Sequence, residues 1–207
     1  LLPIVDSLGW SENAPDMSVL ANWTATYYSC EVKILPPAHL GVHKHPIRKT
    51  RHNNICLQVA ERSWYMEGRV GLDDNSFQTH VDGLLRALSD VKTSGFYTDS
   101  QRIDDAFAVV GVTMCDLYSG ADDLFVAGMA CPMLYTGVLS FARYHPCIKM
   151  HPNEWEDVGY TKRSTNYPYI ETEKKRPNLL SHPPPMSISM TSELLRRAGK
   201  LLLHEIG

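Results

Sequence analysis

The segment Ala106–Met114 limits the possible folds of this chain more than any other feature of its sequence. It is apolar apart from one threonine and is rich in β-branched residues, which is typical of a strand buried on both faces. Such strands occur in parallel sheets that are covered by helices. Apolar residues recur three and four positions apart within Gln78–Val91, which predicts an amphipathic helix ahead of the buried strand. A strand, a helix and a buried strand predict a βαβ unit and an α/β (α+β) fold.

Shorter patterns predict the elements in the first half of the chain. The first 20 residues mix proline, glycine, aspartate and serine, and we expect them to be irregular or weakly helical. Apolar and polar residues alternate over Tyr28–Ile34, which predicts a strand with one solvated face that ends before Pro36. The polar, basic stretch Ala38–His52 is interpreted as a loop, and Ile55–Val59 as a second, short strand.

Two further strands and a helix are expected in the second half of the chain. Leu124–Ala130 and Gly137–Tyr144 are joined by a segment that contains Pro132, so we expect antiparallel neighbours or an edge pair. Residues 145–188 are polar and contain many prolines, which indicates an inserted lid or a disordered insertion. A helix begins near Ser189–Ser192. The apolar stripe of this helix consists of Leu194, Leu195, Ala198, Leu201, Leu202 and Ile206.

The composition excludes several classes of function. Of 207 residues, 43% are hydrophobic and 21% are charged, as expected for a single soluble globular domain. A net charge of −3 indicates neither nucleic acid nor an anionic membrane as a partner, and no apolar run reaches the roughly 18 residues of a membrane helix. The five cysteines form no CxxC pair, so we expect reduced thiols in a cytoplasmic or nuclear protein.

The pair His204-Glu205 suggests the chemistry of a zinc hydrolase. Such enzymes place two histidines four residues apart on a helix, where both reach one metal ion, and a glutamate beside the metal-bound water. The chain contains the first histidine and the glutamate and ends at Gly207, where the second histidine would be the next residue. Taken alone, one such dipeptide is expected by chance, and the alternative interpretation is a histidine at the edge of a core helix.

Four segments of the chain, in the same order, resemble the archaemetzincin family. GVTMCDLY at Gly111–Tyr118 resembles the family pattern G-[IV]-T-x-x-D-L-Y, and LFVAG at Leu124–Gly128 resembles its F-V-F-G strand. GVLSFARY at Gly137–Tyr144 resembles G-[VI]-x-S-[FL]-x-R-[FY], and LLLHEIG at Leu201–Gly207 resembles the opening of the H-E-[IL]-G-H metal helix. Together with a looser match over Gln78–Val91, these segments cover about half of the chain.

The resemblance implies a zinc metallopeptidase of the metzincin clan that hydrolyses peptides or proteins, and some family members are described as aminopeptidases. It implies an upper subdomain with a twisted mixed sheet, an antiparallel edge strand and two main helices. Matched residue by residue, His204 corresponds to the first ligand of the catalytic Zn²⁺ and Glu205 to the general base. A second, structural zinc is expected on four cysteines in a later part of such a protein.

The resemblance also implies a substrate-binding strand. Gly137–Tyr144 corresponds to the edge strand of the sheet, along which an extended peptide lies antiparallel and forms main-chain hydrogen bonds. The expected substrate-binding residues are Gly137, Val138, Leu139, Ser140 and Phe141.

Both ends of the chain suggest a piece of a longer protein. Residue 1 is leucine, and Gly207 lies inside the metal motif. We expect residues 1–207 to form a single domain, the upper part of a catalytic domain whose C-terminal subdomain and remaining zinc ligands lie beyond Gly207. Because a hydrolytic zinc site needs three protein ligands, we expect the chain by itself to be inactive. The alternative is a non-catalytic, peptide-binding or scaffold relative that has lost the metal.

Other polar residues allow two interpretations. Asp116 and Tyr118 follow the buried strand and stabilise either the end of the sheet or the cleft. His39, His43 and His45 share the spacing of a metal site on a strand, but their basic context favours a solvated loop. The histidines of the insertion, interpreted as surface residues, are His145, His151 and His182.

Overall fold

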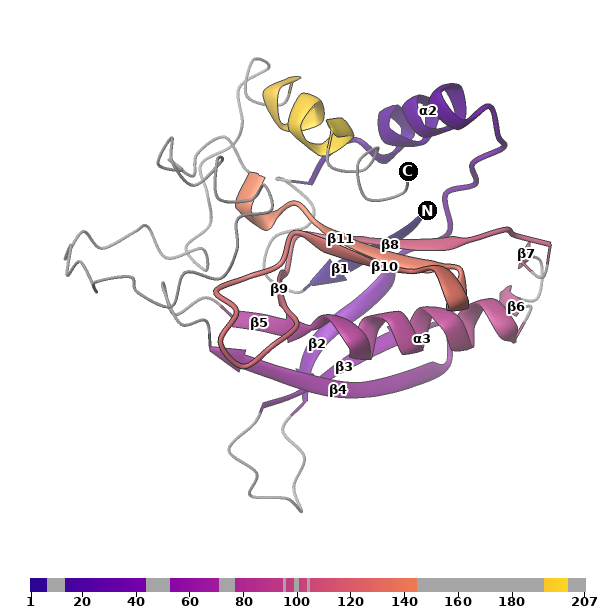
Figure 1. Ribbon diagram of the computed structural model, residues 1–207. Helices are drawn as coiled ribbons and strands as arrows, with labels where there is room; N and C mark the ends of the chain where they lie inside the picture. The colour runs from indigo at the N-terminus through magenta and orange to yellow at the C-terminus, as the bar shows by residue number, and fades with distance from the viewer. Residues whose placement is uncertain are drawn as a thin grey trace.

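The computed structural model describes residues 1–6, 14–43, 53–70, 77–94, 96–98, 101–103, 105–144 and 192–200. Over these ranges the chain forms a large mixed β-sheet with helices on both of its faces (Figure 1). The predicted α/β (α+β) class is confirmed.

Nine strands of the described part of the chain form one sheet in the order β10-β11-β8-β1-β2-β3-β4-β5-β9, and β6 and β7 form a separate ribbon. The strands of the large sheet are β1 (Leu2–Asp6), β2 (Ala38–His43), β3 (Asn53–Val59), β4 (Arg62–Val70), β5 (Phe77–His80), β8 (Val109–Thr113), β9 (Asp116–Tyr118), β10 (Gly128–Cys131) and β11 (Thr136–Ser140). The ribbon consists of β6 (Phe96–Thr98) and β7 (Gln101–Arg102). The helical elements are α2 (Met17–Tyr28), α3 (Val81–Thr93), the 3₁₀ turns η1 (Pro132–Leu134) and η2 (Ala142–Tyr144), and a C-terminal helix at residues 192–200.

The buried strand predicted within Ala106–Met114 is β8. It lies between β1 and β11, and both pairings are parallel. All of its residues are buried, because α3 covers one face of this part of the sheet while α2 and the C-terminal helix cover the other. Strands β1 and β2 are also parallel and are connected through α2. The parallel neighbours of β8 agree with the predicted parallel sheet. The βαβ unit predicted around the helix at Gln78–Val91 is wrong, because β5, the strand ahead of α3, is separated from β8 by strands β1 to β4.

The remaining strands curl around α3. Strands β2 to β5 form an antiparallel meander, and β9 pairs in parallel with β5. In Figure 1, α3 lies on the concave side of the curl, between β8 and β11 on one side and β3 and β4 on the other. The backbone N–H of Val126, just ahead of β10, donates to the carbonyl of Leu117 in β9 (2.8 Å). The segment that leads into β10, at one end of the sheet, therefore contacts β9 at the other end.

Helix α3 has the amphipathic character that the pattern in Gln78–Val91 predicts. Leu84 and Leu88 are fully buried against the sheet, and truncation of a buried leucine typically costs about 2–5 kcal/mol. The helix begins at Val81, later than the pattern, because Phe77–His80 pairs with β4 and β9 as β5.

The prediction of a strand at Tyr28–Ile34 is wrong. Tyr28 is the last residue of α2, and the residues after it are irregular. The side chain of Asp16 accepts hydrogen bonds from the backbone N–H groups of Ser18 (2.8 Å) and Val19 (3.3 Å) and so caps α2. Residues 29–37 belong to no described strand, although the backbone N–H of Leu35 donates to the carbonyl of Leu1, just ahead of β1 (2.8 Å).

Two segments expected to be irregular contain strands. Ala38–His43, within the expected loop, is β2 and pairs with β1 and β3. Leu2–Asp6, within the expected irregular N-terminus, is β1. Both segments are short, and their neighbours in the sheet supply the backbone hydrogen bonds that local sequence patterns do not reveal. The short strand predicted at Ile55–Val59 is confirmed within β3.

None of the described helices has the length and apolar character needed to span a membrane.

Candidate functional site

The C-terminal helix, which precedes the predicted zinc ligand in sequence, is packed into a core. Leu194 and Ala198 are fully buried in a cluster that also contains Val112 and Phe141 from the sheet region and Leu20 from α2. The described part of this helix agrees with the predicted apolar stripe. The predicted zinc ligand, His204, and the predicted general base, Glu205, lie outside the described residues, as does the expected insertion at residues 145–188.

An ionic cluster occupies the first turns of the C-terminal helix. Glu193 accepts hydrogen bonds from Nε and Nη2 of Arg196 (2.8 Å each) and from Nε of Arg197 (2.7 Å). These hydrogen bonds lower the pKa of the Glu193 carboxyl from its ordinary value of 4.5 to about 2. Arg197 also donates to the backbone carbonyl of Tyr144 (3.4 Å) and so connects the helix to η2.

The strand that was expected to bind substrate is not at the edge of the sheet. Gly137–Ser140 belongs to β11, whose backbone pairs with β8 on one side and with β10 on the other. Of the strands that the structure describes, β10 is the terminal one at this end of the sheet, and it is antiparallel to β11. The antiparallel edge pair is confirmed, but the assignment of the edge within it is wrong. A peptide cannot add to β11, because its main-chain hydrogen-bonding groups already face two neighbouring strands.

The five residues that were expected to bind substrate lie within the sheet or in the hydrophobic clusters beside it. Val138, Leu139 and Phe141 are buried in the two hydrophobic clusters of the sheet. The hydroxyl of Ser140 donates to the carbonyl of Cys115 (2.7 Å) and accepts from the backbone N–H of Ala142. The neighbouring Gly137 pairs with Val110 and Ala130 in the adjacent strands. These residues hold the sheet together.

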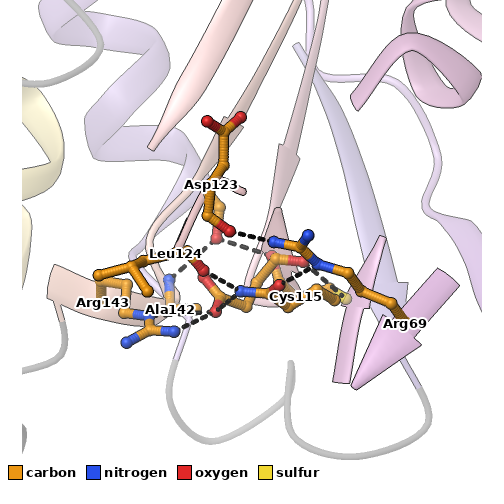
Figure 2. A network of polar contacts seen from close by, with 9 residues as sticks. Arg69, Cys115, Asp123, Leu124, Ala142 and Arg143 are labelled. Carbon is orange, nitrogen blue, oxygen red and sulfur yellow. Dashed lines mark hydrogen bonds and ion pairs between the residues drawn. The ribbon is translucent and has the colours of Figure 1, made fainter. Parts of the chain in front are cut away.

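A buried ion pair lies where β9 meets η2 (Figure 2). Asp116 is 3% exposed and Arg143 is 5% exposed. Nη2 and Nε of Arg143 donate to Oδ2 of Asp116 at 2.5 and 3.1 Å, and the same oxygen accepts from Nε2 of Gln78 (2.9 Å). The guanidinium of Arg143 also lies over the ring of Phe125, 4.7 Å from its centre. Oδ2 of this carboxylate therefore accepts three hydrogen bonds, which offset part of the cost of burying the charge.

The loop that leads to β10 is held by a second arginine. Nη1 of Arg69 donates to the carbonyls of Gly120 (3.1 Å) and Ala121 (2.8 Å), and Nη2 donates to the carbonyl of Asp123. Nε of Arg69 donates to Oε1 of Gln78 (2.8 Å), and Nε2 of Gln78 donates onward to the carbonyl of Leu124 (2.6 Å). Figure 2 shows Arg69 beside the backbone of Asp123, with Leu124 next to it. Strand β10 thus follows a loop that side chains from β4 and β5 hold in place.

Tyr118 packs beside this network. The guanidinium of Arg69 lies over its ring at 4.0 Å from the centre, and His80 meets the same ring edge to face at 4.8 Å. Burial raises the pKa of the Tyr118 hydroxyl above its ordinary value of 10, and the Glu67 carboxylate raises it further. Of the two roles considered for Asp116 and Tyr118, the contacts favour stabilisation of the sheet end. The sequence alone indicated Asp116 but not Arg69 or Gln78, which have no distinguishing local pattern.

The described residues contain no group of three or more histidine, cysteine, aspartate or glutamate side chains placed to hold a metal ion. His39 is exposed on β2 and His43 ends the same strand, so the interpretation of this segment as a loop is wrong. His45 and the three histidines of the insertion lie outside the described residues.

Several known proteins are similar to this chain over most of its length. Archaemetzincin-2 of Pongo abelii is 30% identical over 183 residues, and the alignment covers 88% of this chain and 39% of the relative. The same protein of Macaca fascicularis is 29% identical over 183 residues and that of Homo sapiens is 30% identical over 185, with the same coverage. No protein-family model matches the chain, and no solved structure matches it significantly.

The chain spans about two fifths of the length of these curated relatives, because the alignments cover 39% of them. The alignments extend over most of this chain and are not confined to the four segments that resemble the family patterns. On these grounds, the chain belongs to the archaemetzincin family.

Proposed function

We propose that residues 1–207 form the upper part of the catalytic domain of a zinc-dependent peptidase. One observation carries the proposal: the helix that precedes His204-Glu205 is buried against the sheet at Leu194 and Ala198, in a chain that is homologous to archaemetzincins over 88% of its length. A helix embedded in this way is a rigid support for a metal ligand, which catalytic geometry requires.

His204 is proposed as the first ligand of the catalytic zinc. A hydrolytic zinc site needs three protein ligands, and the described residues contain no cluster that could supply them. The described residues therefore do not form a complete site, and the remaining ligands are proposed to lie beyond Gly207, as is a second, structural zinc site. Zinc in such a site supplies a polarised water at neutral pH.

Glu205 is proposed as the general base. Its carboxylate would take the proton of the attacking water and pass it to the leaving amine, so that the peptide nitrogen departs as a neutral amine. The names of the relatives support a metallopeptidase in general. Aminopeptidase activity is the narrower form of the proposal, in which the substrate is the N-terminal residue of a peptide.

The substrate is proposed to bind along β10, which replaces the residues Gly137–Phe141 expected from the sequence. Among the described strands, β10 is the last at its end of the sheet, so an extended peptide could add to its outer edge through main-chain hydrogen bonds. The contacts from Arg69 and Gln78 to the preceding loop support this role, because they hold the strand in a defined position.

The experiment compares the full-length protein that contains this chain with two variants. We expect Glu205→Gln to retain bound zinc and to lose about 10²–10⁴-fold in kcat for peptide hydrolysis, whereas His204→Ala loses the zinc itself. Zinc content is measured by atomic emission and hydrolysis with a quenched fluorescent peptide library. Glu61→Gln, at an exposed position between β3 and β4, is the control.

Two results would contradict the proposal. Full-length protein that contains no zinc and cleaves no peptide supports the non-catalytic scaffold instead. Glu205→Gln protein with unchanged kcat shows that another residue is the general base.

A further inference from the structure

Gly199 of the C-terminal helix lies directly against the indole ring of Trp23 in α2. A Cβ atom added to Gly199 would lie 2.5 Å from both Cε3 and Cζ3 of Trp23, which is closer than carbon atoms approach without displacement. Glycine costs a helix about 1 kcal/mol relative to alanine. At this position the glycine permits an approach of the two helices that no other residue allows.

The contact belongs to a well-packed interface. Leu20 lies in α2 near Trp23, Leu194 and Ala198 lie in the C-terminal helix near Gly199, and all three are fully buried in one cluster. Trp23 is 41% exposed, so one part of its ring faces solvent while another meets the glycine. The sheet supports the C-terminal helix from one side, and α2 limits its position from another.

The location of this contact along the helix connects it with the proposed metal ligand. The apolar stripe of the sequence continues through Leu201, Leu202 and Ile206, which predicts that the helix extends past Gly199. On that pattern His204 follows Gly199 by about 7.5 Å of helical rise. Zinc ligands must be placed within about 0.2 Å of their ideal distances, so a shift of the helix at Gly199 would be transmitted to the metal site.

We propose that Trp23 and Gly199 are positioning residues for the catalytic zinc site, an inference that rests on the function proposed above. The ring of Trp23 sets how closely the C-terminal helix approaches α2, and the sequence continues from this helix to His204. A side chain at position 199 displaces the helix and weakens zinc binding, although neither residue touches the metal.

The test measures zinc affinity in the full-length protein that contains this chain, with the variants Gly199→Ala, Trp23→Ala and the double variant. Zinc affinity is measured by competition with a chromogenic chelator, and the geometry of the site by the visible absorption bands of the Co²⁺-substituted protein. We expect Gly199→Ala to weaken zinc binding about 10- to 100-fold, the range found when groups that orient metal ligands are changed, and to alter the Co²⁺ bands.

The double variant separates a positioning role from general damage. Removal of the indole relieves the clash, so the double variant is expected to bind zinc more tightly than Gly199→Ala and to recover the wild-type Co²⁺ spectrum. Lys200→Ala, at the exposed neighbouring position, is the matched control and should bind zinc like the wild type. If Gly199→Ala does not fold, the double variant must fold and bind zinc for the proposal to stand.

The outcomes distinguish this inference from the function on which it rests. Wild-type protein that binds zinc, together with a Gly199→Ala variant of equal affinity and unchanged Co²⁺ bands, overturns the positioning role alone. Wild-type protein that binds no zinc refutes the proposed function and this inference with it. A double variant that binds zinc no better than Gly199→Ala also overturns the role assigned to Trp23.

Discussion

Asp116 is the residue on which the polar contacts of the sheet end converge. Its carboxylate receives donors from Arg143 in η2 and Gln78 in β5, which are separated from it by 27 and 38 positions in the chain. Two buried opposite charges at 2.5 Å attract strongly at low dielectric, but both have lost their hydration. The net contribution of the pair is therefore modest, while the loss of one partner leaves the other charged and buried.

We expect Asp116→Asn to lower the free energy of unfolding by about 3 kcal/mol, within the range for breaking a buried ion pair from one side. Urea denaturation of the chain, followed by tryptophan fluorescence, measures the change. Asp122→Asn is the control, because Asp122 is exposed in the loop between β9 and β10. It should change the free energy of unfolding by less than about 0.5 kcal/mol. Equal stability of Asp116→Asn and wild type would show that the ion pair is not maintained in solution.

The C-terminal helix is an element whose stability should depend on pH. Arginine hydrogen bonds lower the pKa of the Glu193 carboxyl to about 2, so the folded state favours the charged form more than the unfolded state does. The stabilisation from Glu193 is therefore complete above the ordinary pKa of 4.5 and is lost as the pH falls from there to about 2.

We expect Glu193→Gln to lower the thermal midpoint of the chain at pH 7 and the difference from wild type to disappear as the pH falls from about 4.5 to about 2. Circular dichroism at 222 nm, recorded across that range for both proteins, measures the difference. Glu61→Gln, at an exposed position between two strands, controls for the loss of a surface charge. A difference that persists unchanged to pH 2 would mean that Glu193 acts through packing and not through its charge.

The whole molecule has two cores on opposite faces of one curled sheet. Helix α3 and the inner side of the curl form the larger cluster, and α2, the C-terminal helix and the other face of β8 and β11 form the smaller one. Gly199 and Trp23 meet at the smaller core. The proposed catalytic residues follow the helix of this smaller core, while the proposed edge for substrate is β10, beside β11.

For the chain of residues 1–207 as a whole, we expect no tight zinc binding. A single histidine ligand cannot form the three-ligand site of a zinc hydrolase, and the described residues contain no alternative cluster. Calorimetric titration with Zn²⁺ is expected to show no site with a dissociation constant below about 1 μM, which would correspond to about −8 kcal/mol. A one-to-one submicromolar site would overturn this expectation, and His39→Ala would then test the histidines near β2 as its source.

Periodicity and composition were sufficient to predict the elements that are buried most completely. The unbroken apolar run around Val109–Thr113, the helical spacing of α3 and the stripe that contains Leu194 and Ala198 all agree with the structure. Each of these patterns reports burial of a residue's own side chain, which depends mainly on its immediate sequence. The order of four short segments was likewise enough to predict the family.

Strand partners and the polar network could not be predicted in this way. Strand β1 is a strand because β8 and β2 lie on either side of it, and β10 rather than β11 is the edge because β8 occupies the other side of β11. Arg69 contacts the loop ahead of β10, and both Gln78 and Arg143 contact Asp116. These contacts, like that of Gly199 with Trp23, join positions far apart in the chain. Local patterns record which side chains avoid water, whereas the identity of each neighbour depends on how the complete chain folds back on itself.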